Sequence, residues 1–227
     1  MYLFKFIESQ YLDAFFTNGS LRIGTIYDFK DTIEHTSARG DLNEGKHRIF
    51  RAVTHELKLS STENEPIINE FLKLEDSWGT IQHSIFVTER RSEDGFIFCT
   101  SRDYSQTIFN KWYVDSDKNN ACYAIINPRK FFKEITLRIQ DSVTEYINQD
   151  VVYTLDPIPY NSKEAKLSPA ITKEINKYSW QTENRTIWCP KLPPVKLRPF
   201  VVNVPEAIKY CRPLSYIEKG KIKYYKC

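Results

Sequence analysis

The sequence has 227 residues, a net charge of +3 and 41% hydrophobic residues. A chain of this length can bury a core without disulfide or metal crosslinks, and its small positive charge does not by itself indicate nucleic-acid binding. Its 14 Tyr and 14 Phe beside only 7 Gly favour sheets packed with aromatic rings over glycine-rich nucleotide-binding loops.

The cysteines indicate a reducing compartment. They number 5 and include no CxxC pair, so no disulfide framework or zinc site follows from their spacing. The first residues, MYLFKFIESQ, lack the basic and apolar regions of a signal peptide. No apolar run approaches the roughly 20 residues that span a bilayer. We therefore expect a cytoplasmic protein with no membrane segment.

The N-terminal part predicts a strand, a helix and a second strand. Residues 2–7 supply apolar bulk for a strand, and residues 8–16 place an apolar face on a helix. Gly19 is suited to a left-handed helix cap. Residues 21–26 alternate as a strand. Residues 27–46 are polar and charged, which indicates a loop or a broken helix.

Alternation of apolar and polar residues predicts further strands in the middle of the chain, at 47–59, 80–87, 96–99 and 121–126. The segment 61–66 indicates a turn, and 67–74 fits a helix or a strand. Residues 89–95 resemble a charged loop. Short helices are expected over 105–112 and for one or two turns from Pro128.

The last part predicts strands at 151–155, 178–188 and 199–204, with a helix over 163–178 that Pro169 interrupts. Strands that recur from end to end with few long helices are typical of an α+β fold. We therefore expect one domain, residues 1–227, with mixed or antiparallel sheets and short helices.

The tripeptide Gln181-Thr182-Glu183 is the best candidate active centre. On a strand, Gln181, Glu183 and Arg185 point to the same face. A carboxylate there can hydrogen-bond a ribose hydroxyl and oppose a developing positive charge. The alternative is a solvated strand face on which Glu183 and Arg185 form a weak ion pair.

Two further positions suit a ligand: a carboxylate or a ribose at Thr100 and Ser101, and a pyrophosphate at Arg22. Thr100 and Ser101 end an apolar strand, where their hydroxyls either face a cleft or merely terminate the strand. Arg22 alternates out of the strand 21–26 and could bind a pyrophosphate as a fork, or form a surface ion pair.

Other candidates are weaker. Trp112 and Tyr113 could stack on a planar ring or belong to the core. Asp41 and Glu44 could bind a metal or form an ordinary polar turn. His47 and His55 lie eight residues apart and could share a strand face. The chain contains no GxGxxG, P-loop, GxSxG or HExxH motif.

The order of these motifs carries a resemblance. The segments Leu21-Arg22-Ile23-Gly24-Thr25, Phe98-Cys99-Thr100-Ser101 and Trp180 to Arg185 resemble an uncharacterised group of bacterial proteins found in phage-defence and mobile loci. The same order is similar to the ADP-ribosyltransferase fold. That resemblance makes Glu183 the catalytic glutamate and Gln181 the residue two before it. Thr100 and Ser101 match the hydroxyl motif.

The resemblance also implies a function. NAD would be the substrate, with Lys5 or Arg22 on its pyrophosphate and the ring of Trp112, Tyr113 or Tyr27 on nicotinamide. The protein would be a toxin or effector in phage defence or a toxin–antitoxin system, with a protein or nucleic-acid acceptor and a neutralising antitoxin partner. A metal-dependent nuclease built on Asp41, Glu44 and a histidine, or a non-catalytic sensor, are the alternatives.

Overall fold

The computed structural model describes residues 1–30, 40–60, 65–73, 78–116, 119–192 and 197–226. Its strands are β1 (Leu3–Ile7), β2 (Ser20–Thr25), β3 (Lys46–Val53), β4 (Leu57–Leu59), β5 (Gly79–Ile81), β6 (Ser84–Arg91), β7 (Phe96–Ser101), β8 (Ala121–Ile125), β9 (Val143–Asp150), β10 (Val152–Thr154), β11 (Ile158–Pro159), β12 (Thr172–Glu174), β13 (Glu183–Pro190), β14 (Phe200–Asn203), β15 (Cys211–Glu218) and β16 (Lys221–Tyr224). Its α-helices are α1 (Ser9–Asn18), α2 (Pro66–Asn69), α3 (Gln106–Ser116), α4 (Pro128–Ile139), α5 (Ile175–Tyr178) and α6 (Pro205–Ile208). Its 3₁₀ turns are η1 (Asp28–Lys30), η2 (Glu164–Lys166), η3 (Pro169–Ile171) and η4 (Ser179–Gln181).

Strand β7 is the centre of the largest sheet, which has nine strands among the described residues. One edge of β7 pairs along its length with β13, and β13 pairs in turn with β9. The other edge meets β2 at Phe96 and Ile97 and meets β1 at Ser101. The order then continues from β1 through β8 and β15 to β16. The two ends of β7 therefore lie beside different strands, and Ser101 lies beside both β1 and Glu183.

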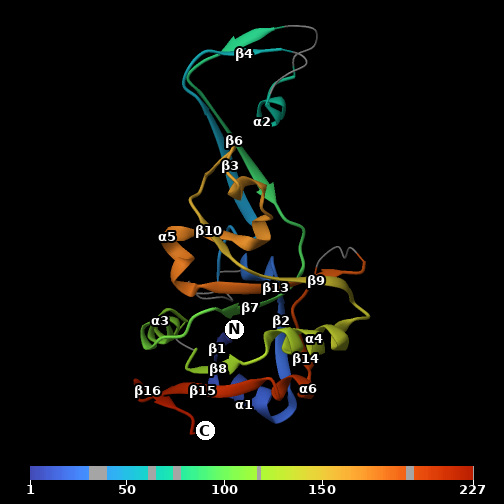
Figure 1. Cartoon of the computed structure of the whole chain (residues 1–227), viewed down its shortest axis with the longest axis vertical. Coiled ribbons are helices and arrows are strands. Elements are labelled where there is room, and N and C mark those ends of the chain that lie inside the picture. The colour runs from blue at the N-terminus through green and yellow to red at the C-terminus, as the bar shows by residue number, and fades with distance from the viewer. Residues whose placement is uncertain (31–39, 61–64, 74–77, 117–118, 193–196, 227) are drawn as a thin grey trace.

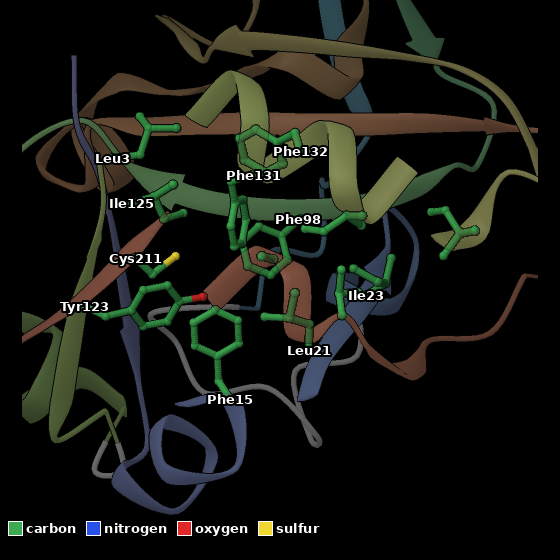
Figure 2. Close-up of a cluster of buried hydrophobic side chains, with 14 of the residues drawn as sticks. Leu3, Phe15, Leu21, Ile23, Phe98, Tyr123, Ile125, Phe131, Phe132 and Cys211 are labelled. Carbon is green, nitrogen blue, oxygen red and sulfur yellow. The ribbon is translucent and has the colours of Figure 1, made fainter. Parts of the chain in front are cut away.

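The main core lies between one face of this sheet and the helices α1, α4 and α6. Figure 2 shows Phe15 of α1 facing Tyr123 of β8, with Phe131 and Phe132 of α4 above them. The Phe15 and Tyr123 rings stack with centroids 5.0 Å apart. The packing of aromatic rings, expected from the composition, thus supplies much of the buried surface.

The opposite face of β7 and β13 carries the polar residues. Cys99 and Ser101 of β7 lie in register with Arg185 and Glu183 of β13 on that face. The segment from η3 to η4 passes over the same region, as Figure 1 shows where α5 and β10 lie above β13. This segment contributes the buried Ala170 and Lys173. A second layer therefore closes over charged groups that the strand alone would expose.

A hairpin arm extends from this body. Strands β3 and β6 pair antiparallel over their whole length and lead away from the nine-stranded sheet to β4 and α2 (Figure 1). Near the tip, Leu59, Ile67 and Ile68 form a small cluster of their own with Ile49.

The structure confirms an α+β arrangement of mixed sheets and short helices. Most pairings are antiparallel, and β10–β12 and β11–β3 are parallel. The described helices include none with the length and apolar character needed to cross a membrane.

Several expected boundaries were wrong. The helix predicted over 163–178 is instead η2, η3, β12 and α5, because Pro169 and the contacts of Lys173 override the helical pattern. The charged residues 89–91 continue β6 and do not form a loop. The strands β9, β15 and β16 were not predicted. The expected turn at 61–66 falls largely outside the described residues, as does the end of the segment 67–74.

Gly19 confirms one local expectation. It caps α1 in the left-handed region, with φ of 76°, and its amide donates to the Phe15 carbonyl at 2.7 Å. A Cβ at this position would lie 2.3 Å from the Val204 carbonyl carbon. Only glycine therefore fits this junction between α1 and α6.

Replacing Leu12 by alanine tests the main core. Leu12 is 1% exposed on α1, so Leu12→Ala leaves a cavity and should lower the free energy of unfolding by about 2–5 kcal/mol. Leu192, which is 80% exposed, is the matched control, and Leu192→Ala should change stability by less than about 0.5 kcal/mol. Urea unfolding followed by circular dichroism measures both, and equal losses would contradict the assigned core.

Candidate active site

The tripeptide Gln181-Thr182-Glu183 is a corner between two elements and not part of one strand. Gln181 ends η4, Thr182 is left-handed with φ of 42° and ψ of 48°, and Glu183 begins β13. The expectation that Gln181 and Glu183 share a strand face by alternation was therefore wrong. Their side chains still meet a common partner, because Lys173 contacts both.

The two hydroxyls at the end of β7 hold this corner. The Ser101 hydroxyl donates to the Gln181 carbonyl at 2.8 Å and lies 2.9 Å from the Thr182 hydroxyl. The Thr100 hydroxyl donates to the Asn184 carbonyl at 3.2 Å. Both residues are buried. Thr100 and Ser101 thus lie beside Glu183, as the motif order implied, but they position its backbone and do not face an open cleft.

Arg185 lies at the centre of a buried network of charges. It is 1% exposed, and its guanidinium donates two hydrogen bonds to the Glu44 carboxylate, at 2.6 and 2.9 Å. Its Nε donates to the Glu183 carboxylate at 2.8 Å, and a terminal nitrogen donates to the Ala170 carbonyl at 2.5 Å. The contact between Glu183 and Arg185 considered from the sequence exists, but in the interior.

Lys173 completes this network. Its ammonium lies 2.9 Å from the Glu183 carboxylate and 3.8 Å from that of Glu44, and it donates to the Gln181 side-chain oxygen at 3.2 Å. Two carboxylates and two cations thus balance to a net charge of zero. A balanced, hydrogen-bonded group of this kind is the form in which charges are tolerated in an interior.

The network fixes the protonation state of its members. Burial alone would raise the pKa of Glu183, but Arg185 and Lys173 outweigh burial and hold that pKa well below its ordinary value. Burial would lower the pKa of Lys173, but the charges of Glu183 and Glu44 and the hydrogen bond to Glu183 together outweigh burial and raise that pKa. Glu183 is therefore an ionised hydrogen-bond acceptor at neutral pH and not a general acid.

Tyr153 holds the main chain of Glu183. The Glu183 amide donates to the Tyr153 hydroxyl oxygen at 2.8 Å, which leaves the phenolic proton free for another acceptor. Burial, and then the nearby Glu183 charge, raise the pKa of Tyr153, so this group stays protonated. Tyr153 and Lys173 are in direct register on the parallel strands β10 and β12. That short ladder therefore sets both contacts with Glu183.

A cleft of about 520 Å³ opens beside these groups and is called the Glu183 cleft. Its polar wall includes Arg102 and Asp150, which pair at 2.6 Å, and the Arg102 side chain is 34% exposed. Its other walls include aromatic and hydroxyl side chains, namely Tyr2, Phe4, Tyr153 and Thr182. The cleft thus brings aromatic rings and a cationic fork beside the buried, ionised Glu183.

The two basic candidates from the sequence are placed differently. Lys5 lies on β1 next to this region, where its ammonium donates to the Cys99 carbonyl at 2.7 Å and lies 4.4 Å from the Phe98 ring centre. Arg22 lies on β2, which borders the far end of β7 from Ser101, and it pairs with Asp28 at 2.8 Å. The structure therefore does not bring Arg22 to Glu183.

The expected aromatic partners also lie elsewhere. Tyr27 follows β2 and donates its hydroxyl to the Ser92 carbonyl at 2.6 Å. Trp112 packs between Phe6 and Trp180, and Tyr113 joins the same hydrophobic cluster. None of these three rings lines the Glu183 cleft.

Glu44, a ligand of the proposed metal site, is already occupied. Both oxygens of Glu44 bind Arg185. His47 contacts the Thr172 hydroxyl through Nδ1 at 3.2 Å. Among the residues that the structure describes, no group of three or more His, Cys, Asp or Glu side chains could hold a metal ion.

Sequence reasoning missed Lys173, Tyr153 and Arg102. Lys173 was assigned to a helix, and its contacts depend on a β10–β12 pairing that short strands do not reveal. Arg102 directly follows Thr100 and Ser101 in the sequence, and this adjacency was the one signal that could have identified it as a site residue. No family model, curated protein or solved structure matches the chain. The chemistry of the site therefore rests on its own geometry.

The left-handed backbone of Thr182 predicts that a glycine at this position is more stable than an alanine. A β-branched residue at positive φ is strained, and the left-handed region costs a non-glycine residue about 1–2 kcal/mol relative to glycine. Thr182→Gly and Thr182→Ala both remove the hydroxyl. The glycine variant should therefore be more stable by about 1 kcal/mol, the reverse of the usual order. Thermal unfolding of the two purified variants measures the difference, and a more stable alanine variant would rule out this corner.

The depressed pKa of Glu183 predicts how stability depends on pH. The native pKa lies below the unfolded value of about 4.3, so this stabilisation is complete above that pH and is lost as pH falls through the native pKa. Glu183→Gln should be about 3–5 kcal/mol less stable than wild type at pH 7, because it leaves buried cations unbalanced. The gap should begin to narrow as the pH falls below about 4 and should go on narrowing in more acid solution, because the wild-type advantage is lost between the unfolded and the native pKa.

Urea unfolding at a series of pH values measures this gap. Glu206, which is exposed on α6, supplies the matched control Glu206→Gln. That control should follow wild type at each pH. A gap between Glu183→Gln and wild type that stays constant from neutral to acid pH would show that Glu183 is not held ionised by its neighbours.

Proposed function

We propose that this protein is an ADP-ribosyltransferase-like enzyme that uses NAD as its substrate, with Glu183 as its catalytic residue. The observation that carries the proposal is an ionised, rigidly held carboxylate at the edge of a cleft that also contains aromatic rings and an arginine. The motif order read from the sequence supplies the reaction class, and the geometry supplies residues suited to it.

The role of Glu183 follows from its charge state. In this reaction the bond between ribose C1′ and nicotinamide breaks, nicotinamide leaves with the bonding electrons, and an acceptor nucleophile bonds to C1′ and releases its proton. An ionised carboxylate that accepts a ribose hydroxyl stabilises the positive charge developing on the ribose. Because the pKa of Glu183 is held low, it acts by charge and hydrogen bonding and does not take up the proton.

The surrounding residues support this role. The rings of Tyr2, Phe4 and Tyr153 offer surfaces for nicotinamide, in place of Trp112, Tyr113 and Tyr27. Arg102 offers a fork for the pyrophosphate in place of Arg22. Gln181 remains a supporting residue through its bond with Lys173. Thr100 and Ser101 act as positioning residues through the backbone of the corner.

The biological setting is part of the proposal. A cytoplasmic toxin or effector in phage defence or a toxin–antitoxin system would modify a protein or nucleic-acid acceptor and would need a neutralising partner. The resemblance in motif order supports this setting, and the site geometry is compatible with either acceptor.

A second candidate is a non-catalytic sensor or interaction module on the same fold. The observation that favours it is the complete internal pairing of Glu183 within a network of zero net charge, which is also what a purely structural core would contain. The two candidates differ in one property, which is turnover of NAD.

The test is to incubate the protein with labelled NAD and a cell lysate, and to measure nicotinamide release and label transfer to protein and to nucleic acid. Wild type should be active. Glu183→Gln should be at least about 100-fold slower, because removal of a preorganised electrostatic group has an effect of that size. Glu206→Gln is the control and should match wild type.

Thermal unfolding of each variant separates lost chemistry from lost folding. If Glu183→Gln does not fold, Tyr153→Phe removes the acceptor of the Glu183 amide and keeps the charge network, and it should slow turnover about tenfold through a displaced carboxylate. Wild type that releases no nicotinamide and labels neither fraction would refute the enzyme and favour the sensor.

A further inference from the structure

A second cleft opens on the other side of the Gln181–Glu183 corner. It has a volume of about 630 Å³, within the usual range for small-molecule sites, and is called the Trp180 cleft. Its walls come from three parts of the chain: the loop that contains Asp41, the helix α3 and the segment from α5 to η4. Apart from Gln181, none of the residues that line this cleft has a role in the proposed NAD chemistry.

Its aromatic wall is held in place from behind. The Trp180 ring packs on Trp112 with centroids 5.0 Å apart, and Trp112 stacks on Phe6 of β1 with centroids 5.8 Å apart. Tyr178 continues the wall and donates its hydroxyl to the Gly40 carbonyl at 3.4 Å. Trp180 is only partly buried. The cleft therefore presents a braced ring, on which a planar group can stack without rearranging the core once the exposed Lys111 side chain, which lies over the ring, turns aside.

Charged groups of both signs surround that ring. The Lys111 ammonium lies 4.4 Å from the centre of the Trp180 ring, and Lys177 lines the cleft while pairing with Glu174 at 2.7 Å. Asp41 and Asp115 supply carboxylates on the same walls. Burial, followed by the nearby Glu44 charge, raises the pKa of Asp41.

This combination fits a nucleotide better than a simple anion or an apolar ligand. A base can stack on Trp180, carboxylates accept hydrogen bonds from ribose hydroxyls or an exocyclic amine, and lysines attract the phosphate. A purely anionic ligand would meet two carboxylates, and an apolar ligand would leave four charged side chains poorly solvated.

We propose that the Trp180 cleft is a nucleotide-binding site in which a base stacks on Trp180 and Lys111 contacts the adjacent phosphate. The base belongs either to a free nucleotide or dinucleotide or to one residue of a single-stranded nucleic acid. Both sources present the same chemistry to the cleft.

Titration calorimetry with AMP tests the site directly, with ribose 5-phosphate as the ligand that lacks a base. AMP should bind, and ribose 5-phosphate should bind at least about tenfold more weakly, because stacking of one base contributes that much affinity. Trp180→Ala should weaken AMP binding at least about tenfold, while Trp180→Phe should retain most of it. Lys111→Gln, a change on the exposed face of α3, should weaken AMP binding about threefold through the phosphate.

Trp78→Ala is the matched control, because Trp78 is 83% exposed and does not line the cleft. It should bind AMP as wild type does. The proposal is overturned if wild type does not bind AMP at millimolar concentration, or if Trp180→Ala binds AMP as well as wild type. It is also overturned if Trp78→Ala weakens binding as much as Trp180→Ala. Circular dichroism of each variant excludes unfolding, and Lys111→Gln keeps the test available should Trp180→Ala fail to fold.

Fluorescence anisotropy with a labelled ten-nucleotide single strand distinguishes the two sources. Tighter binding of the strand than of AMP, with an affinity that falls linearly as salt rises on logarithmic axes, identifies a single-stranded nucleic acid. Equal or weaker binding of the strand identifies a free nucleotide. Nicotinamide release by the same variants keeps this result separate from the proposed enzyme, because the cleft can bind AMP whether or not Glu183 turns over NAD.

Discussion

The charge of Arg185 is the constraint on which the site depends. A guanidinium stays protonated in proteins, so burying it at the centre of the fold requires acceptors that match its fork. Glu44, Glu183 and the Ala170 carbonyl supply them from three separate segments. Each of those segments is irregular or begins an element at the point of contact. One strand residue therefore determines where a loop, a 3₁₀ turn and the start of β13 must lie.

The local backbone follows from this requirement. Gly45 has φ of 67°, and a Cβ there would lie 2.8 Å from the Ile26 side chain, so glycine lets the loop turn sharply just after Glu44. Thr182 adopts the left-handed region just before Glu183. Strain of this kind persists only where the surroundings enforce it, and it is frequent at functional sites. Here Ser101 and the hydrogen bond from the Arg102 amide to the Thr182 carbonyl, at 2.8 Å, provide that enforcement.

The sequence predicted the elements that local patterns specify. The strand, helix, left-handed Gly19 and second strand at the N-terminus were confirmed, as was the strand that ends in Thr100 and Ser101. The helix expected from 163 to 178 was wrong, because the polar pattern there reflects long-range contacts of Lys173. Strand β9 was missed because most of its side chains are exposed on both faces, so it shows no alternation.

In the candidate site, too, the sequence predicted what local patterns specify and missed what depends on long-range contacts. The sequence singled out Gln181, Glu183, Thr100 and Ser101 by motif order, and the register of β7 and β13 brings them together. The roles of Arg22, Tyr27 and Trp112 depended on which strand borders which end of β7, and no local pattern records that. Lys173 contacts Gln181, which lines the Trp180 cleft, and Glu183, which lines the Glu183 cleft. The network of balanced charges therefore lies between the two clefts. Because the network has no net charge, any effect of Glu183 on a ligand must come from its direction and proximity, and the rigidity of the corner is therefore the property that its chemistry requires.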